Sequence, residues 1–394
     1  MDKNIFLVGS NKIQKSTLKP FDEIICDFFD SLSQDIFKKK NKFQESDILT
    51  FGFWLRKKNI LKLKDNFYDN EFKLPLGIIF HITPNNVPIN FAYSLFFGLI
   101  TGNTNIVKVP SKKYFQVEYL CQTINNLLKI KRFSILKKMI NIIRYENDDK
   151  ITEEISKMSN ARIIWGGDQT VKKIKSISAP IKCVDISFPD RYSFSIIDTE
   201  SLKNLSNSNF LNIVKNFFID NYTFDQNACN SSHLIYWVGE EKDNKLIKKF
   251  WVELNNYVNQ KIDYPGTVST DKYNKICSDI INFSNIKKLK KYSKSLHVVT
   301  LKKLLTENEY QRGQWGYFYQ YLSSDLRVLP KIITEKYQTL SYYGFSPDFF
   351  KKFILENQIK GIDRIVPLGR SMEMSYLWDG YNLLRALTRI IDIK

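Results

Sequence analysis

Apolar positions in the first sixty residues recur at helical spacing. Between residues 19 and 63 the apolar side chains return every three or four positions, and Phe21, Ile25 and Phe28 belong to one stripe of this pattern. Such a stripe lies on one face of an α-helix and packs against the rest of the protein. The sequence therefore predicts amphipathic helices that lead into the first domain.

Further along, the pattern changes to short, mainly apolar runs separated by helical segments. The runs are residues 76–82, 105–109, 139–143 and 161–165. Runs of this length are typical of strands buried on both faces. The helical spacing between them, at residues 89–100 for example, indicates a parallel sheet covered by helices. We expect an α/β protein with a doubly wound, Rossmann-type domain.

Polar or glycine-containing loops follow three of these predicted strands. They are residues 83–86, 108–111 and 166–168. The carboxyl ends of parallel strands lie at one edge of a sheet, and ligands of doubly wound sheets bind beyond that edge. We therefore expect the three loops to meet at one ligand crevice.

A second α/β unit is expected after about residue 206. An apolar helix at residues 210–218 precedes a polar segment and a strand at 234–238, and the chain is expected to close with an amphipathic helix. The predicted division of the chain is residues 1–70, 71–215, 216–365 and 366–394.

The chain is strongly basic, with 59 basic and 41 acidic side chains and a formal charge of +18. This charge favours anionic partners such as nucleic acids, phosphorylated cofactors, CoA thioesters and acidic carrier proteins. The lysine clusters, at residues 38–40 and 287–291 for example, alternate with apolar residues as solvated helix faces do, and no zinc-finger or RNP spacing accompanies them. We therefore expect no nucleic-acid partner.

Cysteine usage and the apolar runs bear on the compartment. The five cysteines are scattered without a CxxC pair, which indicates a reducing cytosol and no structural metal site. The amino-terminal apolar run is too short for a secretory signal. Prolines and asparagines interrupt the apolar region 74–109, which disfavours a membrane span. We predict a cytoplasmic protein without a membrane span.

The absence of common motifs narrows the chemistry. The sequence has neither G-x-G-x-x-G nor a P-loop, and its three histidines and lack of a G-x-S-x-G elbow disfavour a metal-dependent or serine hydrolase. Cys229 stands in a polar, small-residue segment directly before a predicted strand, which suits an exposed nucleophile. A buried structural cysteine is the alternative.

Three segments in a fixed order resemble motifs of the aldehyde dehydrogenase superfamily. Residues 84–88 (PNNVP) resemble its PWNFP segment, and residues 102–111 (GNTNIVKVPS) resemble its GNTVVLKPSE segment. Residues 226–229 (QNAC) resemble its glutamine-and-cysteine nucleophile motif.

Other segments are similar to those of LuxC-type long-chain acyl-CoA reductases within this superfamily. These are the Trp-Gly-Gly loop at 165–167, the nucleophile segment DQNACNS at 225–231, RIVPLG at 364–369 and WDG at 378–380. The resemblance covers roughly residues 74–394. It implies an aldehyde-dehydrogenase-like fold with a nicotinamide-cofactor domain and a catalytic domain.

The resemblance implies an enzyme that reduces an acyl thioester to an aldehyde with NADPH, or with NADH as the alternative. Cys229, as a thiolate, would attack the acyl carbonyl and carry the acyl group. Asn86 would donate its side-chain N–H to the carbonyl oxygen while charge builds there. An Asx-turn between two prolines is the structural alternative for Asn86.

The resemblance also implies the residues that hold the cofactor. Lys108 would bond the adenosine ribose or a 2′-phosphate, whereas a snorkelling lysine is its structural alternative. The glycines of the Trp-Gly-Gly loop would let the backbone approach the pyrophosphate at a helix N-terminus. The structural alternative for these glycines is a simple strand-to-helix turn. Asp168 would cap that helix but repel the pyrophosphate. The implied cofactor-binding residues are Thr83, Pro84, Lys108, Pro110, Ser111, Gly166 and Gly167.

Two positions depart from the superfamily pattern. The ELGGK glutamate that activates water in oxidising aldehyde dehydrogenases has no counterpart at residues 184–189, where Asp185 is the nearest carboxylate. His233 stands where acyl-CoA reductases often have proline, and we expect a satisfied strand histidine rather than a group that tunes the thiolate.

Two other functions stay open at this point. The same fold serves CoA-acylating and ordinary aldehyde dehydrogenases, and a basic protein that binds nucleic acid or an anionic surface is the alternative without catalysis. The sequence does not give the acyl chain or its carrier. The partners implied by the resemblance are an acyl-CoA or acyl-carrier substrate, an acyl-transferring protein and further copies of the chain in a homo-oligomer.

Overall fold

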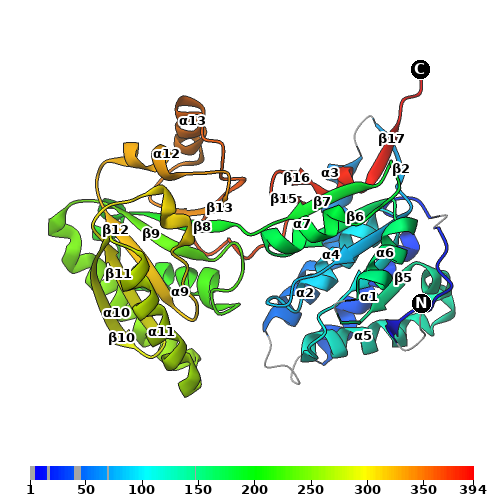
Figure 1. The fold of residues 1–394 in the computed structure, drawn as a ribbon, viewed down its shortest axis with the longest axis horizontal. Helices are drawn as coiled ribbons and strands as arrows, with labels where there is room; N and C mark the ends of the chain where they lie inside the picture. The colour runs from blue at the N-terminus through cyan, green and yellow to red at the C-terminus, as the bar shows by residue number, and fades with distance from the viewer. Residues whose placement is uncertain (1–4, 16–17, 40–45, 69–70, 147) are drawn as a thin grey trace. The chain divides into compact units, whose positions relative to one another are not determined.

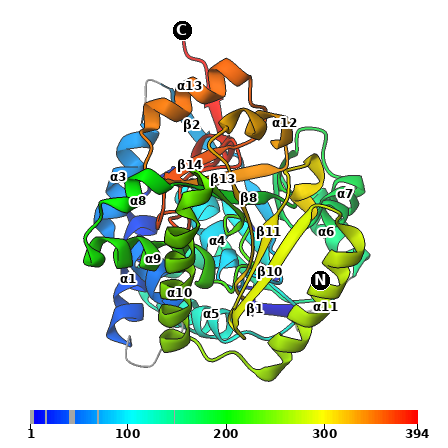
Figure 2. The same ribbon diagram turned by 90° about the vertical axis from the view of Figure 1, so that its left-hand side faces the viewer.

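The computed structural model describes residues 5–15, 18–39, 46–68, 71–146 and 148–394. The chain folds into two compact units. Figures 1 and 2 show that each unit combines strands with helices. The predicted α/β class is confirmed. The first unit comprises Met1–Asp190 and Met374–Lys394, and the second comprises Arg191–Glu373.

The first unit is built on a six-stranded sheet in which every strand except β1 runs parallel to its neighbours. The four predicted strand runs are present and are buried on both faces, apart from a half-buried lysine at the end of β4. In spatial order the strands are β1 (Phe6–Val8), β5 (Ile140–Ile143), β4 (Thr104–Lys108), β3 (Ile78–Ile82), β6 (Ala161–Trp165) and β7 (Val184–Phe188).

Helices of the first unit connect these strands and also include the amino-terminal helices. The predicted amphipathic stripe is confirmed, since Phe28 and Phe29 are buried and pack against the rings of Phe133 and Phe96. The lead-in is therefore part of the first unit. The helices are α1 (Glu23–Lys38), α2 (Ser46–Trp54), α3 (Lys57–Phe67), α4 (Asn90–Ile100), α5 (Phe115–Leu128), the 3-10 helix η3 (Lys131–Lys138), α6 (Asp149–Met158) and α7 (Asp168–Ser176).

The last 21 residues return to the first unit and differ from the expected amphipathic helix. Asp379 and Gly380 both have positive φ, 47° and 76°, as a tight hairpin turn requires. Only a short helix follows, and the final strand pairs antiparallel with a strand that precedes β3. The elements are β15 (Leu377–Trp378), β16 (Tyr381–Asn382), α14 (Leu383–Ala386), β17 (Thr388–Ile391) and its partner β2 (Phe72–Pro75).

The second unit is built on a seven-stranded sheet that is parallel except for the edge pair β10 and β11. In spatial order the strands are β10 (Ile286–Ser293), β11 (Leu296–Leu301), β12 (Tyr317–Leu322), β9 (Ser232–Val238), β8 (Tyr192–Asp198), β13 (Tyr337–Tyr343) and β14 (Arg364–Pro367).

Two apolar clusters cover the faces of this second sheet. One cluster contains side chains of α9, α10 and α11, and the other contains side chains of α12 and α13. The helices are α8 (Thr199–Lys203), α9 (Asn207–Tyr222), α10 (Asn244–Lys261), α11 (Gly266–Asn282), α12 (Leu329–Ile332) and α13 (Pro347–Asn357), with 3-10 helices η4 (Glu241–Asp243), η5 (Thr306–Tyr310) and η6 (Leu326–Val328).

The division between the units differs from the boundaries expected from the sequence. The expected boundary at 215/216 falls inside α9, and the chain instead passes to the second unit at residue 191 because β8 pairs with β9 and β13. The expected boundary at 365/366 falls inside β14, which pairs with β13. Within the described residues, the helices are all too short or too polar to span a membrane.

Candidate functional site

Cys229 lies in the loop between α9 and β9, at the amino-terminal edge of the parallel strands of the second unit, and its side chain is half-buried. Cys183 is half-buried as well, and burial raises its pKa. Burial raises the pKa of Cys26 to about 11 and that of Cys121 to about 12, whereas Cys277 is exposed on α11. Cys229 lies in a polar loop but is less exposed than the sequence suggested, and its role as the nucleophile stays a prediction.

The loop that carries Cys229 is held by the side chain of Gln226. The amide nitrogen of Gln226 donates to the carbonyl oxygens of Ser232 and Tyr317, both at 3.0 Å. Its oxygen accepts from the N–H groups of Gly316 and Tyr317 at 3.1 and 3.0 Å. The glutamine of the nucleophile motif thus fixes the loop against the start of β12.

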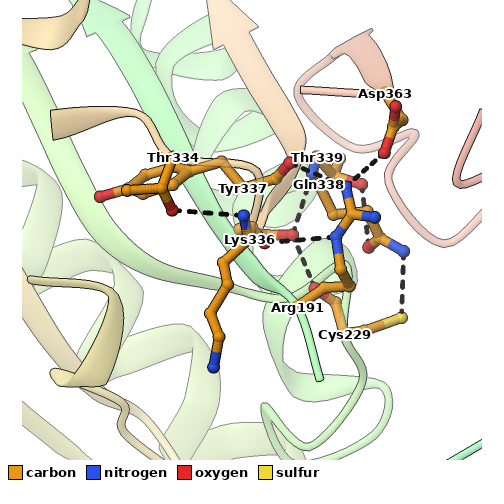
Figure 3. A network of polar contacts seen from close by, with 9 residues as sticks. Arg191, Cys229, Thr334, Lys336, Tyr337, Gln338, Thr339 and Asp363 are labelled. Atoms are coloured by element: carbon orange, nitrogen blue, oxygen red, sulfur yellow. Dashed lines mark hydrogen bonds and ion pairs between the residues drawn. The ribbon is translucent and has the colours of Figure 1, made fainter. Parts of the chain in front are cut away.

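The starts of β8 and β13 contact Cys229 from another side. Ser193 donates from Oγ to the Cys229 carbonyl at 2.6 Å and accepts from the N–H of Thr339 at 3.2 Å. The side-chain nitrogen of Gln338 lies 3.5 Å from the Cys229 sulfur. Figure 3 marks this contact with a dashed line. Both the backbone and the sulfur of Cys229 are therefore held by neighbouring strands.

The RIVPLG segment and the residues after it form a further part of this site. Asp220, at the end of α9, accepts from the N–H groups of Gly369 and Ser371 at 2.6 and 2.9 Å. Burial raises the pKa of Asp220 to about 6. Arg364 donates to the carbonyl of Ser371 at 2.8 Å, and its charge interacts with Cys229. Arg364 therefore supplies a positive charge that interacts with Cys229.

His233 is a structural residue of β9. It is 5% exposed and its Nδ1 accepts from the N–H of Gly313 at 3.3 Å. Burial, together with the charges of Arg312 and Lys275, lowers the pKa of His233 to about 3. The histidine is therefore neutral at physiological pH, in agreement with the expected satisfied strand histidine.

The carboxyl ends of β4, β3 and β6 lie side by side in the first unit, because these strands are neighbours in the sheet. Thr83 donates from Oγ1 to the carbonyl of Lys108 at 2.8 Å. The Lys108 ammonium lies 4.5 Å from the centroid of the Tyr145 ring, and Ser111 donates to the Tyr145 carbonyl at 3.2 Å. Burial and the charge of Lys173 lower the pKa of Lys108.

The remaining implied cofactor residues line the same edge of this sheet. Pro110 accepts at its carbonyl from Arg144 Nε at 3.0 Å, and Pro84 follows Thr83 on the half-buried side of the loop. Asn86 is exposed in that loop. It belongs to the first unit and Cys229 to the second, so its role toward the acyl carbonyl stays a prediction.

The helix after the Trp-Gly-Gly loop begins differently from expectation. Gly167 is the N-cap of α7 and lacks a side-chain cap, so the expectation that Asp168 caps this helix is wrong. Asp168 is the first helical residue, and its carboxylate accepts from the N–H of Asp190 at 3.1 Å. A Cβ placed on Gly167 would meet nothing within 4 Å, whereas one on Gly166 would meet Thr170 at 3.1 Å.

These features fit a phosphate-bearing cofactor. An open helix N-terminus with unoccupied space at Gly167 presents N–H groups to an anion. Lys108 supplies a cation at the end of a strand in the same sheet. In the described part of the chain, no three His, Cys, Asp or Glu side chains are grouped to hold a metal ion.

Asp185 is engaged in an ion pair within the first unit. Both of its oxygens accept from the Arg162 guanidinium, at 2.7 Å each, and Arg162 is 3% exposed. This bidentate pair joins β6 and β7. The carboxylate nearest to the missing glutamate therefore has a structural role.

Sequence comparison relates the chain to a group of thioester reductases. The profile of the family described as acyl-CoA reductase (LuxC) matches residues 60–390. The long-chain acyl-protein thioester reductase of Vibrio harveyi is 21% identical over 324 residues, which are 80% of this chain and 63% of that protein. The enzyme of the same description from Aliivibrio fischeri is 26% identical over 169 residues, 42% of this chain and 33% of its own length. The matched region thus spans less than two thirds of either relative.

Solved structures with a similar fold include aldehyde dehydrogenases. Aldehyde dehydrogenase 21 from Physcomitrella patens superposes with a TM-score of 0.69 at 10% identity, covering 95% of this chain and 86% of that chain. The glyceraldehyde-3-phosphate dehydrogenase of Methanocaldococcus jannaschii, determined with NADP, superposes with a TM-score of 0.64 at 14% identity and covers 94% and 88%. These similarities confirm the predicted fold.

Proposed function

Because the chain belongs to the acyl-CoA reductase (LuxC) family, we propose that it reduces an acyl thioester to an aldehyde through an acyl group carried on Cys229. One observation carries the proposal. The half-buried sulfur of Cys229 lies 3.5 Å from an amide nitrogen and interacts with the charge of Arg364. Such surroundings favour a thiolate, which is the nucleophilic form of cysteine.

In the acylation step the thiolate of Cys229 attacks the carbonyl carbon of the substrate thioester. A bond forms between Sγ and that carbon, the bond from carbon to the carrier sulfur breaks, and the carrier leaves as a thiolate that takes up a proton from solvent. The side chain of Asn86 and the N–H of Cys229 are proposed to donate to the carbonyl oxygen while it bears charge.

The cofactor is proposed to be a reduced nicotinamide dinucleotide, which supplies the hydride when bound. The glyceraldehyde-3-phosphate dehydrogenase of M. jannaschii, which has a similar fold, was determined with NADP. A putative methylmalonate-semialdehyde dehydrogenase of Sinorhizobium meliloti, also similar in fold, was determined with NAD. The open N-terminus of α7 would hold the pyrophosphate, and Lys108 would hold the ribose or a 2′-phosphate. We propose NADPH because a cation at Lys108 favours the additional phosphate.

The ion pair of Asp185 supports reduction over oxidation to an acid. An oxidising enzyme needs a free carboxylate that activates water against the acyl group. Both oxygens of Asp185 are already bonded to Arg162. An acyl group on Cys229 is therefore not expected to be hydrolysed by this residue.

The acyl donor is proposed to be a CoA or protein-bound thioester. The relatives described as acyl-protein thioester reductases support the protein-bound form, and the net charge of +18 suits an acidic carrier or CoA phosphates. We propose that the enzyme acts in the cytoplasm. Its proposed partners are an acyl-transferring protein and further copies of the chain in a homo-oligomer.

The test is intact-protein mass spectrometry after incubation with a panel of acyl-CoAs and no reductant. We expect a mass increase of one acyl group on the parent, no increase on Cys229→Ser, and aldehyde release on addition of NADPH. Serine stays protonated near neutral pH, so its acylation falls by orders of magnitude.

Cys277→Ser is the matched control, because Cys277 is exposed on α11 in the same unit. It should acylate as the parent does. An acyl adduct that persists in Cys229→Ser would move the nucleophile elsewhere and contradict the proposed function.

A further inference from the structure

We propose that Gln338 is a catalytic residue that donates a hydrogen bond from its side-chain amide to the sulfur of Cys229 and stabilises the thiolate. The inference rests on the proposed function, in which Cys229 reacts as an anion. Nε2 of Gln338 lies 3.5 Å from Sγ of Cys229. Figure 3 shows the amide of Gln338 directed at this sulfur.

The side-chain oxygen of Gln338 faces the next residue of β13. Thr339 Oγ1 lies 3.4 Å from this oxygen, a long contact for a hydroxyl donor. Gln338 is only 2% exposed, so water does not readily compete for its amide. With its oxygen on the side of the Thr339 hydroxyl, the amide has its nitrogen on the side of the sulfur.

Strand pairing fixes the distance between the amide and the sulfur. Ser193 of β8 bonds the Cys229 carbonyl and the N–H of Thr339, so it joins the cysteine loop to the residue that follows Gln338. β8 and β13 are adjacent parallel strands, and their register shifts between Tyr337 and Leu340, where Gln338 lies. The two bonds of Ser193 therefore bridge the cysteine loop and this irregular start of β13, which keeps Gln338 beside the sulfur.

The contact differs in strength between the two protonation states of the sulfur. A hydrogen bond to a charged acceptor is about twice as strong as one between neutral groups. Because the thiolate has no proton, it interacts favourably only with the N–H side of the amide. Gln338 thus stabilises the ionised state, and it adds a donor to the cationic field of Arg364.

The experiment measures alkylation of Cys229 by iodoacetamide as a function of pH, with the modified peptide quantified by mass spectrometry. In Gln338→Met, which keeps the length of the side chain but has no donor, we expect the rate near pH 7 to fall about tenfold. At high pH, where the thiol is fully ionised, the rate should return to within about twofold of the parent.

A second variant guards against a purely structural effect of methionine. Gln338→Glu keeps the shape of the side chain and can still accept from Thr339, but it places negative charge beside the sulfur. The pH midpoint of Cys229 alkylation should therefore move further upward in Gln338→Glu than in Gln338→Met. Gln260→Met is the matched control at an exposed position of α10. The alkylation rate of the exposed Cys277, measured in the same samples, is the internal reference.

Two outcomes would overturn the inference. Alkylation profiles that match the parent in both variants would show that the amide does not stabilise the thiolate. A rate that falls by the same factor at every pH would show that Gln338 controls access only.

Failure of the proposed function would look different. A parent that gains no acyl group from any thioester would contradict that function, while a shifted alkylation profile in the Gln338 variants would still establish the hydrogen bond.

Discussion

Lys108 illustrates how a single residue can be costly to folding and useful to binding. Burial lowers its pKa, and the nearby Lys173 adds repulsion. The contact of its ammonium with the Tyr145 ring, at 4.5 Å, offsets part of this cost. A lysine kept charged in such a place is expected where an anion binds.

Lys108→Ala should weaken the binding of NADPH about tenfold or more, because a charge-assisted hydrogen bond to the ribose or its phosphate is lost. Acylation of Cys229 should stay at the parent level. Fluorescence titration with NADPH and the mass of the acylated protein measure the two effects. Lys112→Ala, at an exposed position of the same loop, is the control. Unchanged affinity in Lys108→Ala would make Lys108 structural.

The site residues differ in how far their local sequence reveals them. Cys229 stands in a small-residue polar loop that is visible as a motif, and the Trp-Gly-Gly loop is similarly local. Gln338 and Ser193 lie 109 and 36 residues away from Cys229 and reach it only through the pairing of β8, β9 and β13. No local pattern marks them, because the register of a sheet depends on the whole unit.

Among the elements, the turn between α4 and β4 holds three parts of the first unit together through Asn103. This residue is fully buried, and its oxygen accepts from the N–H of Gly77 at 2.8 Å. Its nitrogen donates to Thr101 Oγ1 and to the carbonyl of Leu387, both at 2.9 Å. The asparagine of the GNTNIVKVPS segment therefore connects the start of β3, the end of α4 and the carboxyl-terminal segment.

Asn103→Ala should lower the free energy of unfolding of the first unit by about 2–4 kcal/mol, because it leaves the half-buried N–H of Gly77 and the buried carbonyl of Leu387 without their partner. Urea unfolding measures the change. Asn126→Ala, exposed on α5, should change it by less than about 0.5 kcal/mol. A loss as small as that of the control would show that water or a shifted backbone replaces the bonds of Asn103.

Four strands of the first unit follow from the sequence, whereas its carboxyl-terminal segment does not. The runs that become β3, β4, β5 and β6 are mainly apolar, and their polar residues are buried as well, apart from Lys108. At the end of the chain, the sequence predicted an amphipathic helix, but the structure has only the short helix α14. The antiparallel partner β2 lies more than 300 residues earlier and draws residues 388–391 into a strand. Long-range pairing of this kind overrides local propensity.

Over the whole molecule, all three histidines are buried in a neutral form. His81 is fully buried between Ser94 and Asn105, at 2.8 and 3.0 Å, and burial lowers its pKa to about 4. Burial likewise lowers the pKa of His233 to about 3 and that of His297 to about 4. Folding therefore disfavours the second proton on all three imidazole rings, so the charged form is destabilised.

This destabilisation of the charged form makes the protein sensitive to acid. A histidine with a lowered pKa in the folded state contributes stability that is present above pH 6.5 and is lost as the pH falls toward 4. Between pH 7.5 and pH 5, the parent should lose about 2 kcal/mol more unfolding free energy than His81→Gln. Urea unfolding of both proteins at the two pH values measures this difference.

Asp220 responds to pH with the opposite sign, since its pKa is raised to about 6 and its contribution is lost as the pH rises through that value. Asp220 is present in both proteins, so its pH-dependent contribution cancels when the parent is compared with His81→Gln. Equal pH slopes in the two proteins would show that His81 is protonated in the folded state.

The pairing of β2 with β17 affects how the protein is made. The whole second unit lies between these two strands in the chain, so a ribosome translates Arg191–Glu373 before it reaches residues 388–391. The second unit is continuous and can fold as it emerges, whereas β2 waits with its N–H and C=O groups unpaired. During this interval, the backbone groups that β2 will pair with β17 are open to another strand, so the first unit is exposed to mispairing until the end of the chain has been made.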